Sequence, residues 1–437
     1  MFNSVINAFK TKELRRKILY TIFLLIIFRL GEFITVPGVN KTALQQALGN
    51  YDALGFMDMI SGGGLSQMSV LAMSITPYIN SSIIMQLLTV AIPALERIAR
   101  DGDEGRKKIA QYTRYLTIIL AFIQSTGMYF GFTDLIENRN ALSYLTVILS
   151  LTAGTAFLMW LGEKITENGI GNGISLIIFA GIVSRFPSIA TTIYENIKAG
   201  SLSYIVALIF VVVLVVVFGF IVLMNDAERR IPVQYAKRVV GRKMYGGQST
   251  HMPIKVNMSG VLPIIFASSI LSLPGTVQMF LSSSKYEGTF WEKFFKAFQS
   301  DSWWYAGMYF ILIIFFAYFY STIQYNPIEM ANNLRKNNGV IPGIRPGRPT
   351  SDYILKIISR LTLIGALMIS VVALFPIVYS LICDAAIKPL PDAADSTGGM
   401  SITMGGTSLI ILVGVALETV RQLESQMMMR HYKGFLD

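Results

Sequence analysis

The sequence contains about ten apolar runs that are long enough, or nearly long enough, to cross a lipid bilayer as helices. Runs of this kind form helices in a membrane because a helix satisfies its own backbone hydrogen bonds. Only 14% of the 437 residues are charged, whereas soluble domains average about one quarter. We therefore predict an all-α, polytopic membrane protein with ten transmembrane helices. The predicted spans are Ile18–Val36, Met68–Ile92, Tyr115–Gly131, Tyr144–Leu161, Ile174–Ile193, Leu202–Met224, Gly260–Leu281, Tyr305–Tyr325, Ile357–Cys383 and Ser401–Val420.

Lysine and arginine are concentrated in alternate loops between these runs. The two chain ends and residues 93–114, 162–173, 225–257 and 326–356 hold most of the 37 Lys and Arg. Loops rich in Lys and Arg stay cytoplasmic, so both termini are predicted to be cytoplasmic. Ile18–Val36 is too long for the apolar region of a cleaved signal peptide, and we expect it to remain as the first span. The net charge of +11 then indicates orientation and contact with anionic lipid or an acidic partner, rather than nucleic-acid binding.

Ten spans divide into two sets of five, in residues 1–200 and residues 201–437. Because five is odd, the second set enters the membrane in the opposite direction, as in inverted-repeat transporters and channels. The second span of each set is interrupted: Gly62–Gly64 stand just before the first of them, and Pro263, Pro274 and Gly275 lie in the other. Paired interruptions indicate a functional interface between the halves. The alternative is that Gly and Pro are simply frequent in membrane helices.

The segment Asp52–Ser66 mixes apolar and polar residues, ends in three glycines and is too short to span. It has two interpretations. One is a re-entrant element enclosed by protein or by a water-filled cavity. The other is an amphipathic turn outside the membrane, and the residues alone favour this second interpretation.

Two cytoplasmic loops are candidates for binding a partner. Asn225–Met244 carries six Lys and Arg between two apolar runs, and it would form a positively charged platform near residues 225–257. The loop near residues 326–356 carries Arg345 between two Pro-Gly pairs. Pro and Gly form tight turns, which would present this arginine at a loop tip.

The sequence gives little support for an enzyme or for an ion-coupled transporter. No metal, nucleotide or nucleophile motif stands in a suitable context, and both histidines lie outside the spans. We expect no enzyme activity and no cofactor. Ion-coupled carriers place ionisable groups inside the bundle, but here Arg29 and Glu32 form the clearest such pair, three residues apart near a span end. A local structural pair is favoured, and a passive pore is favoured over a solute carrier or an intramembrane enzyme.

Seven groups of residues occur in the order found in one known family. They are Ser74–Leu88; Gln111–Tyr115; Met159–Glu163 with Ile174 and Ser175; Gln248–His251 with Val256–Met258 and Phe266–Ser269; Pro342–Gly347; Arg360–Leu367; and Gly405–Leu409. Over nearly its whole length, the chain resembles the bacterial SecY family, the channel-forming subunit of the Sec protein translocase. The resemblance implies two inverted five-helix halves that are hinged between the fifth and sixth spans. It also implies a pore that opens sideways between the second and seventh spans.

The resemblance assigns residues to three parts of this pore. A single isoleucine in a membrane helix ordinarily packs against neighbours, but a narrow apolar ring blocks ions by dewetting. Asp52–Ser66 corresponds to the family's plug helix, which reverses the interpretation favoured above. The isoleucine ring is assigned to Ile75, Ile79, Ile178, Ile265 and Ile411; the plug and its hinge to Leu54, Phe56, Met57, Met59, Ile60, Gly62, Gly63 and Gly64; and the lateral gate to Asn80, Ile83, Gln86, Ser268 and Ser269.

The resemblance also implies function and partners. Unfolded secretory preproteins with their signal peptides would cross the bacterial plasma membrane through this channel, and transmembrane segments would leave it sideways into the phospholipid. The small membrane subunits SecE and SecG, the SecA ATPase and the ribosome are implied partners. Arg242, Lys243 and Arg345 would contact the motor or the ribosome, where ribosomal RNA phosphates but no DNA are plausible ligands. Ser282–Trp304 has no counterpart, and its tryptophans indicate an interfacial anchor.

Overall fold

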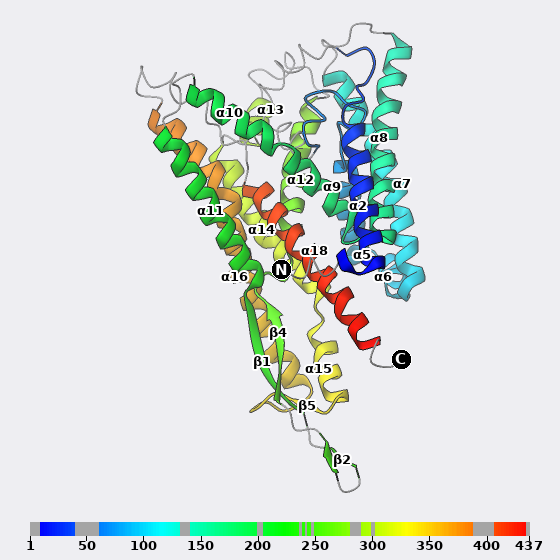
Figure 1. Cartoon of the computed structure of the whole chain (residues 1–437), viewed down its shortest axis with the longest axis vertical. Coiled ribbons are helices and arrows are strands. Elements are labelled where there is room, and N and C mark those ends of the chain that lie inside the picture. The colour runs from blue at the N-terminus through cyan, green and yellow to red at the C-terminus, as the bar shows by residue number, and fades with distance from the viewer. Residues whose placement is uncertain are drawn as a thin grey trace.

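Each of the ten predicted spans overlaps a helix of the structure (Figure 1). The computed structural model of the chain describes residues 9–39, 61–131, 140–198, 204–235, 238–240, 243–245, 249–279, 290–298, 302–387 and 406–433. The helices of the first half are α2 (Lys12–Gly31), α5 (Thr76–Ala91), α6 (Pro93–Arg100), α7 (Gly102–Gly131), α8 (Ala141–Asn168), α9 (Gly173–Ser184) and α10 (Phe186–Lys198). Those of the second half are α11 (Tyr204–Asp226), α12 (Leu262–Met279), α13 (Phe290–Ala297), α14 (Trp303–Gln324), α15 (Pro327–Lys336), α16 (Arg348–Ile387) and α18 (Gly406–Lys433).

The helices have the length and composition of a multi-pass membrane protein. Among the described residues, four stretches are long and apolar enough to cross a membrane: α8, α9 with α10, α14 with α15, and α16. The bent pair of α5 and α6 is a fifth candidate. Shorter apolar stretches occupy α11 and α12. Long apolar side chains are exposed along outer helix faces, as at Phe23 of α2 and Val216 of α11. Such exposed apolar faces suit contact with lipid rather than with water.

The second span begins later than predicted. Residues 61–75 form turns, and the helix starts only at Thr76, so the prediction of helix from Met68 is wrong. The backbone has positive φ at Met68 and Ser74, a conformation that an α-helix does not accommodate. This segment instead bonds to the chain after α2, where the Val36 amide donates to the Met68 carbonyl at 2.9 Å. Tertiary hydrogen bonds therefore replace helical ones here.

Two other spans are bent or divided. The axes of α5 and α6 meet at 103° at Ile92, where Pro93 occupies the first turn of α6. The predicted fifth span is split at Arg185 into α9 and α10. Conversely, α7, α16 and α18 extend well beyond their apolar runs, so parts of the predicted loops are helical.

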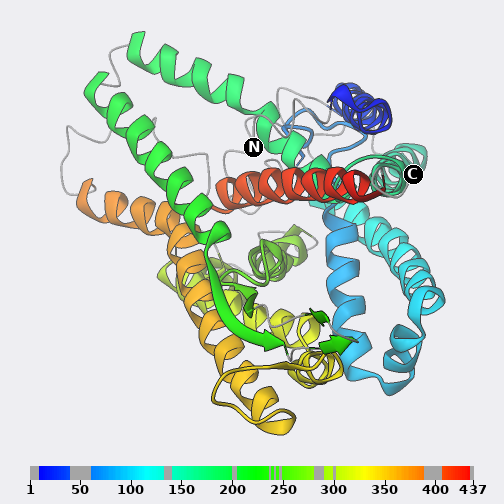
Figure 2. The same cartoon turned by 60° about the horizontal axis from the view of Figure 1, so that its bottom comes forward.

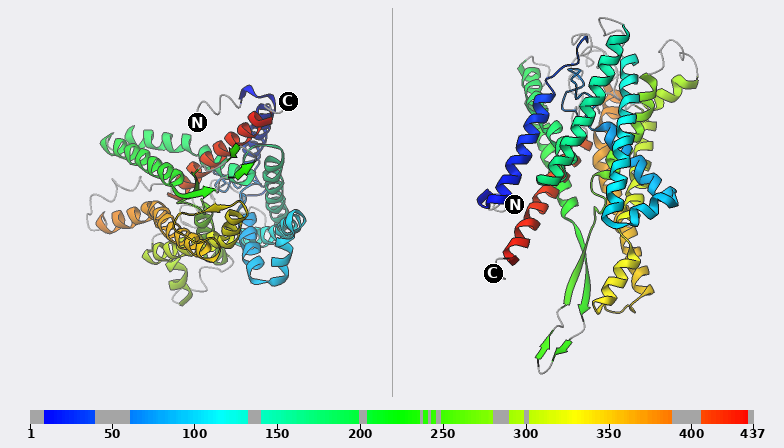
Figure 3. Two further views of the ribbon diagram at one scale, coloured as in Figure 1. Left: turned by 90° about the horizontal axis from the view of Figure 1, so that it is seen from below. Right: turned by 90° about the vertical axis from the view of Figure 1, so that its right-hand side faces the viewer.

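The predicted basic loops form a small β-sheet, which the sequence analysis did not predict. β1 (Glu228–Tyr235) pairs antiparallel with β4 (Ser249–Lys255), and β5 (Gly339–Val340) joins the other edge of β1. A second hairpin, β2 (Arg238–Val240) with β3 (Lys243–Tyr245), lies at its tip. We call the β1–β4 unit the hairpin, and it projects beyond the helix bundle (Figures 1 and 3).

The hairpin owes its position to alternating burial along β1. Ile231 and Val233 are buried, whereas Arg230, Pro232 and Gln234, at the alternate positions, are exposed. The buried side chains belong to a cluster with residues of α15 and α16, including Leu334, Ile354 and Ile358. Because strand side chains alternate between two faces, Ile231 and Val233 share the face that packs, and Arg230 lies on the opposite, exposed face.

α18, the helix of the tenth predicted span, connects the two halves. α18 contacts α9 of the first half and α11 and α16 of the second. Seen from the hairpin end, α18 (red) runs across the middle of the molecule, from beside α11 and α16 toward α8 (Figure 2). Any change in the relative position of the halves therefore has to involve α18.

Replacing Gly154 by Ala is expected to destabilise the fold. Gly154 of α8 faces the 61–75 segment, and a Cβ built on it would lie 2.0 Å from the Val70 carbonyl oxygen. Overpacking of this kind costs about 1–3 kcal/mol. Thermal unfolding in detergent should show a lower midpoint for Gly154→Ala. Gly307→Ala on α14 is the matched control, because nothing lies within 4 Å of its Cβ position; an unchanged Gly154→Ala would contradict the close contact.

Candidate functional site

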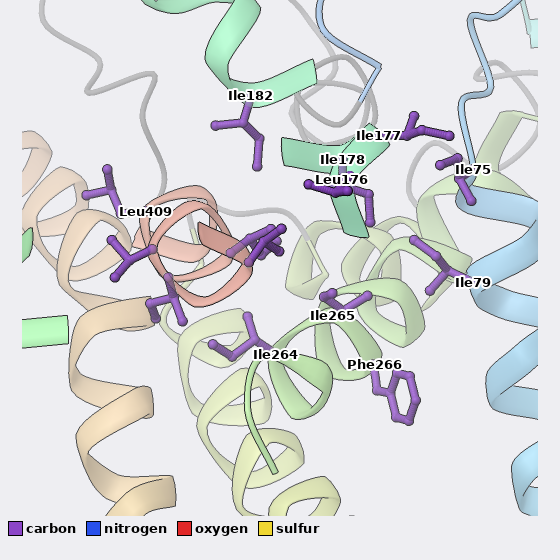
Figure 4. Close-up of a cluster of buried hydrophobic side chains, with 14 of the residues drawn as sticks. Ile75, Ile79, Leu176, Ile177, Ile178, Ile182, Ile264, Ile265, Phe266 and Leu409 are labelled. Carbon is purple, nitrogen blue, oxygen red and sulfur yellow. The ribbon is translucent and has the colours of Figure 1, made fainter. Parts of the chain in front are cut away.

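All five residues assigned to the isoleucine ring are buried in one apolar cluster. Ile75 lies at the start of α5 and Ile79 in its first turns, Ile178 lies in α9, Ile265 in α12 and Ile411 in α18. Figure 4 shows Ile75, Ile79, Ile178 and Ile265 converging from different helices on one region. None of the five lies on the exposed perimeter. The structure thus brings them together, and their closing of a pore stays a prediction.

A cavity of about 590 Å³ is lined in part by three of these isoleucines. Ile178, Ile265 and Ile411 belong to its lining, and the rest of the wall comes mainly from the ends of helices and strands near the hairpin. We call this cavity the vestibule. Its neutral hydrogen-bonding residues include Asn172, Ser175, Asn225, Asn257, Gln324, Gln422 and Ser425.

Charge in the vestibule is sparse and mutually compensated. Burial lowers the pKa of Lys255, and the nearby Arg421 lowers it further. Three carboxylates, those of Glu418, Asp226 and Glu228, act on this pKa in the opposite direction. Because positive and negative groups lie side by side, the wall offers no strong site for an ion of one sign. Among the described residues, no group of three metal-ligating side chains occurs.

Asn172 fixes the start of the helix that carries Ile178. Its side-chain oxygen accepts hydrogen bonds from the backbone amides of Ile174 and Ser175, at 3.1 and 3.4 Å, which is an N-cap of α9. A Cβ on Gly173 would lie 2.0 Å from the Gly162 carbonyl oxygen, so α9 packs closely against α8. The glycine-rich stretch before α9 therefore forms a defined turn, which fixes where α9 begins and hence where Ile178 lies along the bundle.

The residues assigned to the lateral gate lie on two helices that contact each other, α5 and α12. Asn80, Ile83, Ser268 and Ser269 are buried, and Gln86 is partly buried. The gate hydroxyls bond within their own helices: the Ser268 hydroxyl donates to the Ile265 carbonyl at 3.0 Å. Among the described residues, no hydrogen bond joins these gate side chains across α5 and α12, so their contact rests on packing.

The glycines assigned to the hinge adopt the conformations that only glycine takes easily. Gly62 and Gly63 have φ values of +66° and +93°. The Gly62 carbonyl accepts hydrogen bonds from Arg29 at 3.2 Å and from Ser184 at 3.4 Å. Arg29 also pairs with the buried Glu32, which confirms the predicted local ion pair.

Some assigned residues lie outside the described part of the chain. The apolar plug residues Leu54, Phe56, Met57, Met59 and Ile60 fall there, as does Arg242. The backbone of Lys243 is described as part of β3.

Arg345 is exposed in the loop after β5. The two glycines that flank it, Gly343 and Gly347, have φ values of +81° and +104°, as the predicted turns require. The Arg345 carbonyl accepts a hydrogen bond from the Thr350 hydroxyl at 2.8 Å, which ties the loop to the start of α16.

The outer segment Ser282–Trp304 contains helix α13, whose Trp291 is exposed. Trp303 and Trp304 begin α14, and both are exposed. Exposed tryptophans beside spanning helices are typical of the membrane interface.

The sequence analysis missed the polar junction at the rim of the vestibule. Asn257 donates to the Asn225 side-chain oxygen at 2.8 Å, and Arg421 contacts Asn225 and Asp226. These residues stand at the ends of apolar runs, where polar residues are common. Only the fold shows that three separate ends meet.

Comparison with known proteins agrees with this arrangement. The model of the SecY family matches residues 69–420. The protein translocase subunit SecY of Halalkalibacterium halodurans is 45% identical over the full length of both chains. This chain belongs to the SecY family. The SecY subunits of Bacillus subtilis and Thermotoga maritima are 44% and 42% identical, with 100% of this chain covered in each case.

Solved structures extend the SecY likeness to the fold. A structure described as a protein-conducting channel has a TM-score of 0.61 and 18% identity, covering 94% of this chain and 91% of the other. Sec61 in a canine ribosome–channel complex has a TM-score of 0.57 and 16% identity, with the same coverage. The ten-helix arrangement is thus that of the SecY and Sec61 channels.

A cysteine pair on α18 tests where the vestibule ends. Ser425 lines the vestibule, whereas Ser408, on the other side of Ile411, is fully buried. In a Cys383→Ser background, Ser425→Cys should react readily with a hydrophilic maleimide and Ser408→Cys should react slowly, because burial in apolar surroundings disfavours the reactive thiolate. Equal labelling rates, measured by mass shift, would show that water passes the isoleucines.

Proposed function

We propose that this chain is the protein-conducting channel of the Sec pathway. Unfolded secretory polypeptides would cross the membrane through it, and hydrophobic segments would leave it sideways into the lipid. The observation that carries the proposal is a vestibule whose wall combines polar side chains with buried isoleucines from helices of both halves. Membership of the SecY family supports it.

The isoleucine ring would close the pore without binding the chain that passes through it. A narrow apolar constriction excludes ions because water does not fill it. Isoleucine side chains offer no hydrogen bonds, so they would part around an extended chain and close behind it. The neutral amides and hydroxyls of the vestibule would form exchangeable hydrogen bonds with a polypeptide backbone of any sequence.

Sideways release would occur between α5 and α12. The two helices contact each other, and the contact rests on packing, as described above. In a membrane, such a contact separates at modest cost because lipid tails replace the lost van der Waals contacts. Residues 1–200 and 201–437 would move apart as two inverted halves, with the glycines at 62–64 releasing the plug.

The energy for transport would come from partners. Arg345, Arg242 and Lys243 would bind the SecA ATPase or the ribosome, in the second case through RNA phosphates. SecE and SecG would complete the complex in the bacterial plasma membrane, with both termini of this chain cytoplasmic. The outward-facing charge of β1 and the exposed Arg345 support docking on this side.

A solute carrier is the alternative function. It would need a mid-membrane site built from charged or aromatic side chains. The described central cluster is instead mainly aliphatic, and two of its aromatic members, Phe266 and Phe316, pack against each other. Uptake of a small labelled solute by the purified chain, without a motor, would favour the carrier.

Polar substitution of the ring should make membranes leak. The triple variant Ile178→Ser, Ile265→Ser and Ile411→Ser should raise the resting ion conductance of planar bilayers, because hydroxyls let water wet the constriction. The matched control replaces the preceding residue in each helix, Ile177, Ile264 and Ile410, which are also fully buried. Should a triple variant fail to fold, Ile265→Ser is compared with Ile264→Ser. Equal conductance in both sets would remove these isoleucines from the seal.

Reversing the charge of Arg345 should block motor-driven transport. Arg345→Glu is expected to abolish SecA-dependent import of a preprotein into proteoliposomes while the channel still inserts into the membrane. Arg348→Glu is the control, because Arg348 is also exposed three residues later. Normal import with Arg345→Glu would show that this loop tip is not the docking contact.

A further inference from the structure

The hairpin is tied at its base to α12 and α18, two helices that carry ring isoleucines. α11 ends at Asp226, and β1 begins two residues later at Glu228. On the returning side, β4 ends at Lys255 and leads through Asn257 to α12. The Val256 amide donates to the Ala227 carbonyl at 2.9 Å and closes the base of the hairpin.

Arg421 connects this base to α18. Its guanidinium donates to the Asn225 backbone carbonyl at 3.1 Å and forms an ion pair with the Asp226 carboxylate. Arg421 is ten residues after Ile411 on one continuous helix, which is about 15 Å along the axis. The guanidinium therefore links the hairpin to the helix that places Ile411 in the ring.

Asn257 connects the same base to α12. Its side-chain amide donates to the Asn225 side-chain oxygen at 2.8 Å, and Asn257 itself is only 5% exposed. Eight residues further along, Ile265 of α12 belongs to the ring cluster. The three side chains of Asn225, Asn257 and Arg421 all line the vestibule, so the junction they form lies between hairpin and ring.

The contacts of the junction are directional, which suits them to carry displacement. A guanidinium that bonds a carbonyl and a carboxylate together is held in orientation as well as in distance. The side chains of Arg421 and Asp226 are 33% and 47% exposed, so water screens their attraction and the pair can break and re-form.

We propose that Arg421 is a positioning residue that transmits the docking of a cytoplasmic motor on the hairpin to α18 and, through Asn225 and Asn257, to α12. The inference rests on the proposed function, and it adds a route from docking surface to ring. Arg421 contributes nothing to the affinity of the motor, because it lies behind the docking surface. It contributes to how far a bound motor opens the ring.

The test separates motor affinity from the maximal transport rate. Full-length channel with its membrane partners is reconstituted into proteoliposomes, and preprotein import is measured against SecA concentration. Arg421→Ala should leave the half-saturating SecA concentration unchanged and lower the maximal rate by about two- to thirtyfold, the range of mutational effects on coupling. Arg421→Lys, which keeps the charge and one donor group, should restore part of the rate.

Two control variants bracket the result. Arg345→Gln should raise the half-saturating SecA concentration instead, as expected for a docking residue. Arg114→Ala breaks an ion pair with Glu163 of similar length and exposure, 2.7 Å and 45% and 23% exposed, between α7 and α8 and remote from the hairpin. It should change neither quantity.

Asp226→Asn, which removes only the charge partner, replaces Arg421→Ala if that variant fails to fold, and the same lowered maximal rate is expected.

Three outcomes would overturn the inference. One is a raised half-saturating concentration with Arg421→Ala, which would make Arg421 a docking residue. Another is an unchanged maximal import rate with Arg421→Ala while the wild-type channel responds to SecA; this result would leave the proposed function intact. A wild-type channel that does not respond to SecA would remove the proposed function and this inference together.

Discussion

Aliphatic packing at the centre of the bundle is the interaction on which the rest of the structure depends. Isoleucines from α5, α9, α12 and α18 form one buried cluster where helices of the two halves meet. Inside a membrane such packing gains little from the hydrophobic effect, and it holds through close van der Waals contact.

Polar groups fix the ends of several elements around this apolar centre. Asn172 caps α9, Arg29 and Ser184 hold the Gly62 carbonyl, and the Arg421 junction closes the base of the hairpin. Each of these contacts fixes where one helix begins or ends relative to another. The positions of the ring isoleucines along the bundle are therefore set by hydrogen bonds at the helix ends, away from the isoleucines themselves.

Sequence reasoning succeeded where one property dominates and failed where two segments had to meet. Apolar length located all ten spans, and the spacing of Arg29 and Glu32 gave their ion pair. Helix was predicted wrongly for residues 68–75, which bond instead to the chain after α2. The strands of the hairpin were missed because their partner residues, such as Glu228 and Lys255, are far apart in the sequence.

The sequence by itself determined the membrane class, the number and order of the spans and the positions of the basic loops. These follow from local hydropathy and charge, which each segment carries regardless of its neighbours. Only the tertiary structure decided that five separate isoleucines share one cluster, that a vestibule is lined in part by three of them, and that Arg421 reaches the hairpin. Those facts depend on contacts between distant segments, and no local pattern encodes which segments come into contact.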